Sequence, residues 1–235
     1  ADVTAALAGT LGATYTGAVE VTGSAQSGTD GVTKLNALAG KTAGVVTASI
    51  TGTAAELKLL STVATDKITV GVSDAHDLAE LKAINNATDG TITLHDYTVA
   101  LSGSMADVSA ALAGTLGATY TGTVEATDAQ SGSDGVTAVK NLAAKTDGKV
   151  TATLTASASE LASLNTASTD IIAVTATSVP TGADGVTFLN TLAGKTAGVV
   201  TASITGAAAD LDSLGTASTD VITVTASSVP TGAAG

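Results

Sequence analysis

Cysteine is absent from this 235-residue chain, and positive charge, proline and aromatic residues are all scarce. The absence of cysteine excludes disulfide bonds and thiol chemistry. Nine Lys and Arg residues stand against 21 Asp and Glu residues, so the chain lacks the clustered basic side chains that nucleic acids and anionic membrane surfaces require. No apolar run approaches the roughly 20 residues that span a bilayer. We therefore expect an acidic protein that neither binds nucleic acid nor spans a membrane.

Residues that carry catalysis are equally scarce. The chain contains no HExxH pair, no GxSxG turn, no P-loop and no dinucleotide-binding fingerprint. Its only histidines are His76, in AHDLAEL, and His95, in TLHDY. We expect both to occupy solvated edge positions, and we expect that the protein is not an enzyme.

Internal repetition is what the sequence has in abundance. The stretch TASTDIIAVTATSVPTGA at residues 166–183 returns as TASTDVITVTASSVPTGA at residues 216–233. DGVTKLNALAGKTAGVVTASITG, from Asp30, recurs in two variants further along the chain, and ADVTAALAGTLGATYTG recurs once. A repeat of about 20 to 50 residues is typical of stacked repeat proteins. We count about nine units, which start near Ala1, Asp30, Ala54, Ala75, Met105, Asp134, Ala158, Asp184 and Ala208.

Each unit follows one pattern of helix, turn and strand. Apolar residues three positions apart, as in Val136, Val139 and Leu142, predict one face of a short helix. Leu161 and Leu211, each with a second Leu three residues on, fit the same pattern. A turn rich in Gly, Asn, Thr and Asp follows, and apolar residues then alternate with Thr or Ser, which predicts a half-buried strand. The predicted strands include residues 68–70, 92–94, 150–154, 200–204 and 222–225.

A single unit of this kind cannot bury its own apolar side, whereas a stack of units can. Strand–helix–strand connections are almost always right-handed and give parallel strands. The sequence therefore predicts an α/β repeat solenoid, one array over residues 1–235 with a parallel sheet and helices on one face. One alternative stays open, in which two strands and 50 residues (the offset from Asp170 to Asp220) form each solenoid turn. We interpret the longer tails VEVTGSAQSGT, HDYTVALSGS and VEATDAQSGS as loops at one edge.

The strand positions that the helices would leave uncovered carry mostly Thr and Ser. Because Thr is a β-branched residue that tolerates water, an ordinary exposed sheet face is one interpretation. A flat, regular Thr array could instead bind ice or a polysaccharide, carry glycans, or pack against a second copy. The candidate interaction face comprises Thr47, Ser49, Thr51, Thr151, Thr153, Thr201, Ser203, Thr223 and Thr225.

Aspartates recur in the turns just before the strands. If they stacked in one column, like charges would come close, and calcium would relieve the repulsion through several oxygen ligands. Helix-cap or turn roles are the alternative, since several units carry Ala-Gly at this place and the GGxGxD calcium repeat is absent. Calcium is the only cofactor that the sequence suggests. The candidate ligands are Asp66, Asp89, Asp147, Asp170 and Asp220.

Units of the form AAxLxxL…TDxITVTxS, for example residues 208–227, resemble the Ala/Thr-rich repeats of very long secreted bacterial proteins. These include cyanobacterial cell-surface, haemolysin-like and S-layer-like proteins. The resemblance extends over essentially the whole chain. It implies export, often with calcium-binding repeats elsewhere in the protein, and it brings no catalytic residues.

These features predict an extracellular or cell-surface structural protein, a section of a filament, surface layer or adhesin stalk. Both ends of the sequence carry ordinary repeats rather than polar caps. We therefore expect chains to associate with themselves into a homopolymer through open sheet edges. The alternative is a binding module that uses its Thr and Ser ladders for ice or a glycan.

Overall fold

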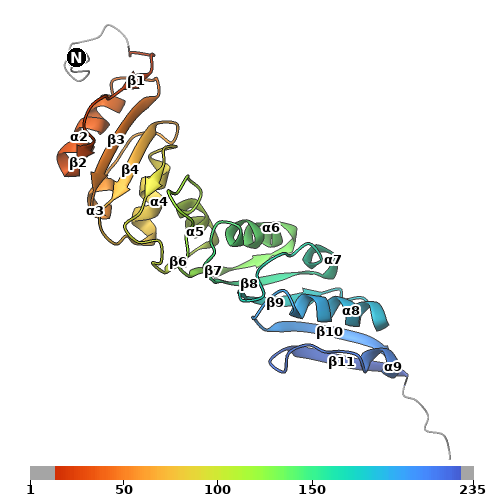
Figure 1. Cartoon of the computed structure of the whole chain (residues 1–235). Coiled ribbons are helices and arrows are strands. Elements are labelled where there is room, and N and C mark those ends of the chain that lie inside the picture. The colour runs from red at the N-terminus through yellow and green to blue at the C-terminus, as the bar shows by residue number, and fades with distance from the viewer. Residues whose placement is uncertain (1–13, 229–235) are drawn as a thin grey trace, which may run out of the picture. The chain divides into compact units, whose positions relative to one another are not determined.

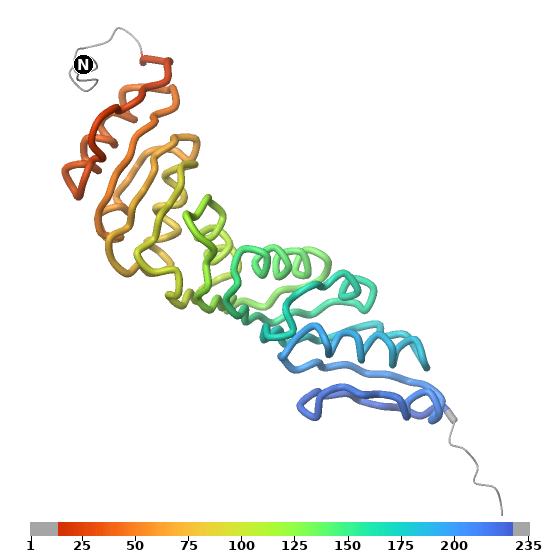
Figure 2. The backbone as a smooth tube through the Cα atoms, viewed as in Figure 1, coloured from red at the N-terminus to blue at the C-terminus, as the bar shows by residue number. Residues whose placement is uncertain are grey.

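The computed structural model of the chain describes residues 14–228 and divides it into two compact parts. The N-terminal part contains the residues up to Thr123 together with Lys145–Gly148. The C-terminal part contains Val124–Ala144 and the residues from Lys149 onward. Figure 2 follows the backbone through each part. The helix predicted near Ala1 lies outside the described residues.

In the N-terminal part, parallel strands alternate with helices (Figure 1). Its elements are β1 (Val19–Glu20), β2 (Gln26–Ser27), α2 (Gly28–Ala39), β3 (Val46–Gly52), α3 (Ala54–Leu57), β4 (Lys67–Val72), α4 (Leu78–Asn86), β5 (Ile92–Thr93), β6 (Leu101–Gly103) and α5 (Met105–Ala111). Strand β3 pairs with β1, β2 and β4, and β4 pairs in turn with β5. All of these pairs are parallel, as the repeat pattern predicts.

The C-terminal part is more regular. Its elements are β7 (Val124–Ser131), α6 (Gly132–Ala143), β8 (Val150–Ser157), α7 (Ala158–Leu161), β9 (Ile171–Thr177), α8 (Gly182–Ala193), β10 (Val200–Ala207), α9 (Ala208–Leu211) and β11 (Val221–Ser228). Strands β7 to β11 pair in chain order, and every pair is parallel. The predicted α/β class with parallel sheets is confirmed. Successive repeat units supply β8, β9 and β10, one strand each, so the alternative of two strands in each turn is wrong.

The alternation of side chains along a strand explains where the core lies. On β8, Val150 and Leu154 are both 0% exposed, whereas Thr153 between them is exposed. The matching helix α6 buries Val139 and Leu142, which are at most 1% exposed. Successive strand residues point to opposite faces, so the Val and Leu positions form the core with the helix and the Thr positions remain outside it.

Six of the described helices fall into two length classes, and α4 and α5, with nine and seven residues, lie between them. Helices α2, α6 and α8 have 12 residues each, and α3, α7 and α9 have four each. Isolated helices this short are marginal in water, so their stability comes from packing and, for α3 and α7, also from capping by side chains. Among residues 14–228, no helix combines the length and the apolar character that crossing a membrane needs.

The interpretation of the longer tails as loops is wrong for residues 124–131, and it is correct only in part for the other two tails, in which loop residues adjoin short strands. Residues 124–131 form β7, whose register against β8 shifts between Glu125 and Ala129. The residues inserted at this bulge interrupt the two-residue alternation by which a strand is recognised in a sequence. The tail after residue 18 likewise contains β1 and β2, and the tail after His95 contains β6.

Candidate functional site

Three of the turn aspartates, each in the turn that leads into a strand, bind two backbone N–H groups. One N–H group belongs to the same turn, and the other belongs to the first residue of the preceding strand. Asp66 is 1% exposed. Its Oδ1 accepts the backbone N–H of Val46 at 2.7 Å, and its Oδ2 accepts that of Val63 at 3.0 Å. Asp170 and Asp220 make the equivalent two bonds at 2.8–3.0 Å. Each carboxylate thus satisfies two backbone donors, one of them on a neighbouring strand 20 residues earlier.

The intervening turns use threonine in the same place. The hydroxyl of Thr196 accepts the backbone N–H groups of Ile172 and Gly198 at 2.9 and 2.8 Å. The carbonyl oxygens of Asp170 and Ile172 lie 3.0 and 2.9 Å from the same hydroxyl, as acceptors for its proton. A Cβ at position 198 would lie 2.3 Å from Ile172 O, so glycine is what allows this close approach. Thr88 makes the same contacts in the N-terminal part.

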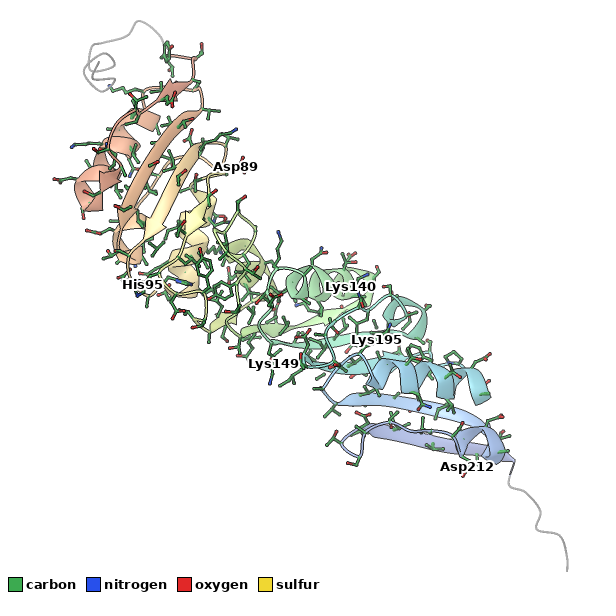
Figure 3. The ribbon with its side chains drawn as sticks, viewed as in Figure 1. Asp89, His95, Lys140, Lys149, Lys195 and Asp212 are labelled. Atoms are coloured by element: carbon green, nitrogen blue, oxygen red, sulfur yellow. The ribbon has the colours of Figure 1, made fainter. Side chains whose placement is uncertain are left out.

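The five candidate calcium ligands therefore divide into two structural classes. Asp66, Asp170 and Asp220 bind backbone N–H groups. Asp89 and Asp147 instead follow the threonine of a threonine turn and are exposed, and Figure 3 labels Asp89 in the turn before β5. Within residues 14–228, no three His, Cys, Asp or Glu side chains lie close enough together to hold one metal ion. These five carboxylates do not form the predicted calcium column within the described residues: three of them bind backbone N–H groups, and Asp89 and Asp147 lie exposed in threonine turns.

The candidate interaction face lies on the uncovered side of the strands. Thr153 is flanked by buried residues on β8, and Thr47, Ser49 and Thr201 have buried neighbours in the same way, whereas Thr223 and Thr225 on β11 do not. Ser49, Thr51, Thr153, Ser203, Thr223 and Thr225 are exposed, and Thr47, Thr151 and Thr201 are half-buried. The face is therefore accessible to a ligand or a partner in each part.

The register of the strands decides which of these side chains are neighbours. A row here is the set of residues that lie opposite one another on successive paired strands. Thr151 and Thr201 are equivalent in the repeat but lie in different rows, because Thr151 is opposite Ile171 and Thr201 is opposite Thr175. Instead, one continuous row crosses the C-terminal sheet through Ser131, Thr155, Thr175, Thr201 and Val221. Its last member, Val221, is 57% exposed and apolar. Lys67 similarly lies opposite Thr47 in the N-terminal part, so the rows are interrupted rather than purely Thr and Ser.

Capping boxes hold the short helices in place. The hydroxyl of Ser157 caps α7 by accepting the N–H of Glu160, and it donates to the Glu160 carboxylate at 2.7 Å. The carboxylate also accepts the Ser157 backbone N–H at 2.8 Å. These bonds, first from the hydroxyl and then from the backbone, hold the pKa of Glu160 below its usual value. In α9 the cap position is Ala207, which offers no side-chain hydrogen bond.

Strand β11 presents apolar side chains that its counterparts bury. Val224 is 48% exposed, whereas the equivalent Val174 on β9 is 1% exposed. Ile222 is half-buried, whereas Ile172 is 0% exposed. Within the described residues β11 pairs with β10 alone, while β9 pairs on both sides. An apolar side with one neighbour missing is a surface that a further strand–helix unit would fit.

The two histidines occupy different surroundings. His95 is exposed, as predicted, and Figure 3 labels it beyond β5. His76 is only 4% exposed, so its predicted solvated position is wrong. Its Nε2 lies 3.3 Å from the hydroxyl of Tyr120, which is fully buried and donates to the Val99 carbonyl at 2.6 Å. No periodic pattern points to this pair, because the two residues lie 44 positions apart.

Burial dominates the chemistry of this pair. It lowers the pKa of His76, although nearby carboxylates, with Asp96 the strongest, act in the opposite direction. It also raises the pKa of Tyr120, so the phenol keeps its proton at neutral pH. A groove of about 670 Å³ lies beside His76 in the N-terminal part. Across this groove the ammonium of Lys82 pairs with the carboxylate of Asp107.

Comparison with known proteins adds no relative. No protein-family model matches the chain, and neither the curated proteins nor the solved structures contain a match.

Proposed function

We propose that the chain is a structural repeat protein of the extracellular space or cell surface. In this proposal it is a section of a filament, surface layer or adhesin stalk, its units continue one solenoid, and it acts by stacking rather than by catalysis. Its partner is a second copy of itself. The exposed apolar side of β11 is the observation that carries the proposal.

Strands β9 and β11 carry the same apolar positions of the repeat in different surroundings. Val174 and Ile172 are buried because a further unit, with β10 and α8, packs beside β9. Val224 and Ile222 have the same places in the repeat and no such neighbour within residues 14–228. One more repeat beside β11 would continue the parallel pairing and bury these side chains, as in other stacked repeat proteins.

Two neighbouring substitutions on β11 test this assembly. Val224→Lys places a charge on the apolar side, and we expect it to abolish filaments or large oligomers in sedimentation and electron microscopy. Thr225→Lys is the matched control, because Thr225 is exposed on the opposite side of the same strand. It should leave assembly intact. A folded chain that sediments as a monomer at high concentration, or equal effects of both substitutions, would refute stacking through β11.

The location can be tested separately. Antibodies against the folded chain should label intact producing cells or material shed from them. Labelling that appears only after the cells are permeabilised would contradict an extracellular role, whatever the result for assembly.

A second candidate function is binding of ice or a glycan by the exposed face. The row of Ser131, Thr155, Thr175 and Thr201 across four paired strands favours it, because hydroxyl groups recur there at regular strand spacings. Thr175→Lys in the middle of the row should remove ice shaping or binding to an insoluble polysaccharide. Val224→Lys should leave that binding unchanged, which separates the two candidates.

A further inference from the structure

The start of β9 is held by the threonine turn that leads into the next strand. The Thr196 hydroxyl accepts the N–H of Ile172 at 2.9 Å, and the carbonyl oxygens of Asp170 and Ile172 lie 3.0 and 2.9 Å from it. The backbone N–H of Ala197 also donates to the Asp170 carbonyl, at 2.7 Å. The start of β9 therefore offers one donor and two carbonyl acceptors, and the threonine turn meets all three.

The start of β4 in the N-terminal part is held in the same way. The Thr88 hydroxyl accepts the N–H of Ile68 at 2.8 Å, and the carbonyl oxygens of Asp66 and Ile68 lie 2.9 and 2.8 Å from it. The N–H of Asp89 donates to the Asp66 carbonyl at 2.7 Å. A strand that follows an aspartate turn is thus met by a threonine turn in both parts.

Strand β11 follows an aspartate turn as well, and its start is open. Ile222 lies opposite Ala202 on the preceding strand, just as Ile172 lies opposite Ala152. The N–H and carbonyl oxygen of Ile222 therefore face away from β10, as those of Ile172 face away from β8. Within residues 14–228, β11 pairs with β10 alone, so no threonine turn covers this third copy of the arrangement.

The chemistry of the arrangement distinguishes the two kinds of turn. A hydroxyl group accepts and donates, so it satisfies an N–H and a carbonyl oxygen together, whereas a carboxylate only accepts and would leave the carbonyl oxygens without a donor. The residue two positions after the threonine must also be small. A Cβ on Gly90 or Gly198 would lie 2.3 Å from the carbonyl oxygen of the facing isoleucine.

We propose that the open start of β11 binds a helix–strand unit with a threonine turn and rejects a unit with an aspartate turn. The proposal rests on the proposed stacking function and names the class of unit that stacks. On β9 the bound unit is α8 with β10, whose Val200 lies opposite Val174. A unit of this class on β11 would place its first strand residue opposite Val224, which is 48% exposed, and cover it.

An extension of the full chain tests this preference. Residues 229–235, VPTGAAG, match VPTGADG at residues 179–185. Appending a second copy of residues 186–207 to the intact chain therefore supplies another α8–β10 unit after β11. Hydrogen exchange is measured in dilute solution, where chains do not associate. We expect the extension to slow exchange at the Ile222 amide by about 10-fold or more, because that N–H gains an acceptor, and to leave the Ile172 amide unchanged.

Substitutions confined to the appended copy give the matched controls. Thr196→Ser keeps the hydroxyl and should keep the slow exchange, whereas Thr196→Asp, Thr196→Val and Gly198→Ala should each restore the fast exchange of the unextended chain. The proposal is overturned if the unaltered extension does not slow exchange at Ile222, or if the Asp, Val or Ala variant slows it equally. Because the added unit is covalently joined, its docking does not require chains to associate. Sedimentation of the unextended chain as a monomer would therefore refute the assembly and leave this result unchanged.

Discussion

Residues 158–177 and 208–227 of the C-terminal part have almost the same sequence and very different surroundings. Leu161 and Leu164 of the first stretch are at most 1% exposed. Their counterparts Leu211 and Leu214 are half-buried. The same apolar pattern therefore forms the same helix and strand twice, but only a neighbour on each side buries the pattern completely.

The turns of the two stretches keep the same hydrogen bonds, although the burial of the apolar residues differs. Asp170 is 3% exposed and Asp220 is half-buried, yet each carboxylate accepts the same two backbone N–H groups. The turn therefore needs only the preceding strand, whereas the apolar residues need the following unit as well. Changes at matched positions should separate these two requirements.

The largest difference is expected at the leucines. Leu161→Ala should lower the free energy of unfolding by about 2–5 kcal/mol, because it leaves a cavity in a filled core. Leu211→Ala should cost less than half as much, because the side chain is already half in water. Urea unfolding of both variants measures the two losses. Equal losses would mean that the exposure of Leu211 is not present in solution.

The aspartate turn should give the next largest effect. Asp170→Ala leaves the N–H groups of Val150 and Ala167 without their acceptor, which should cost about 1–3 kcal/mol. Asp220→Ala should cost less, because water reaches that turn. Hydrogen exchange at the Val150 amide should accelerate in Asp170→Ala and remain slow in the other variant. Unchanged exchange at Val150 would show that the bond across the strands is not formed.

The helix caps should give a smaller difference, of opposite sign in the two stretches. Ser157→Ala removes a cap and should cost about 1 kcal/mol, whereas Ala207→Ser adds one and should stabilise the chain by up to about 1 kcal/mol. Thermal unfolding of the two variants measures both effects. Destabilisation by Ala207→Ser would show that the end of β10 cannot present a capping hydroxyl.

The cap of α7 also carries a pH dependence. The pKa of Glu160 is lowered in the folded chain, so its interaction with Ser157 contributes stability above the usual carboxyl pKa. That contribution is lost as the pH falls through the lowered value. The difference between Ser157→Ala and the parent chain should therefore shrink in acid, and a difference that grows instead would contradict the capping box.

The smallest effect is expected on the exposed face, where the two stretches should not differ. Thr175→Val and Thr225→Val should each change the free energy of unfolding by no more than about 0.5 kcal/mol, because both side chains are exposed. Chemical unfolding checks this. A loss above about 1 kcal/mol at Thr175 alone would indicate that the face is covered.

The sequence by itself determined the repeat, the two periodicities and therefore the alternation of helix with parallel strand. Val136, Val139 and Leu142 identify a helix face, and Val150 to Leu154 identify a strand, because these signals depend on residues a few positions apart. The uncovered Thr and Ser positions follow from the same alternation. Strand β7 was missed because its bulge breaks the alternation that the prediction relies on.

Only the tertiary structure decided which residues meet across strands. Asp170 binds the N–H of Val150 and Asp147 does not take part in such a turn, although both aspartates precede a strand. The burial of His76 against Tyr120 and the open side of β11 are equally invisible in the repeat pattern. The physical reason is that each of these contacts joins groups 20 or more residues apart, and the register and stagger of the sheet, rather than local periodicity, determine which groups come within hydrogen-bonding distance.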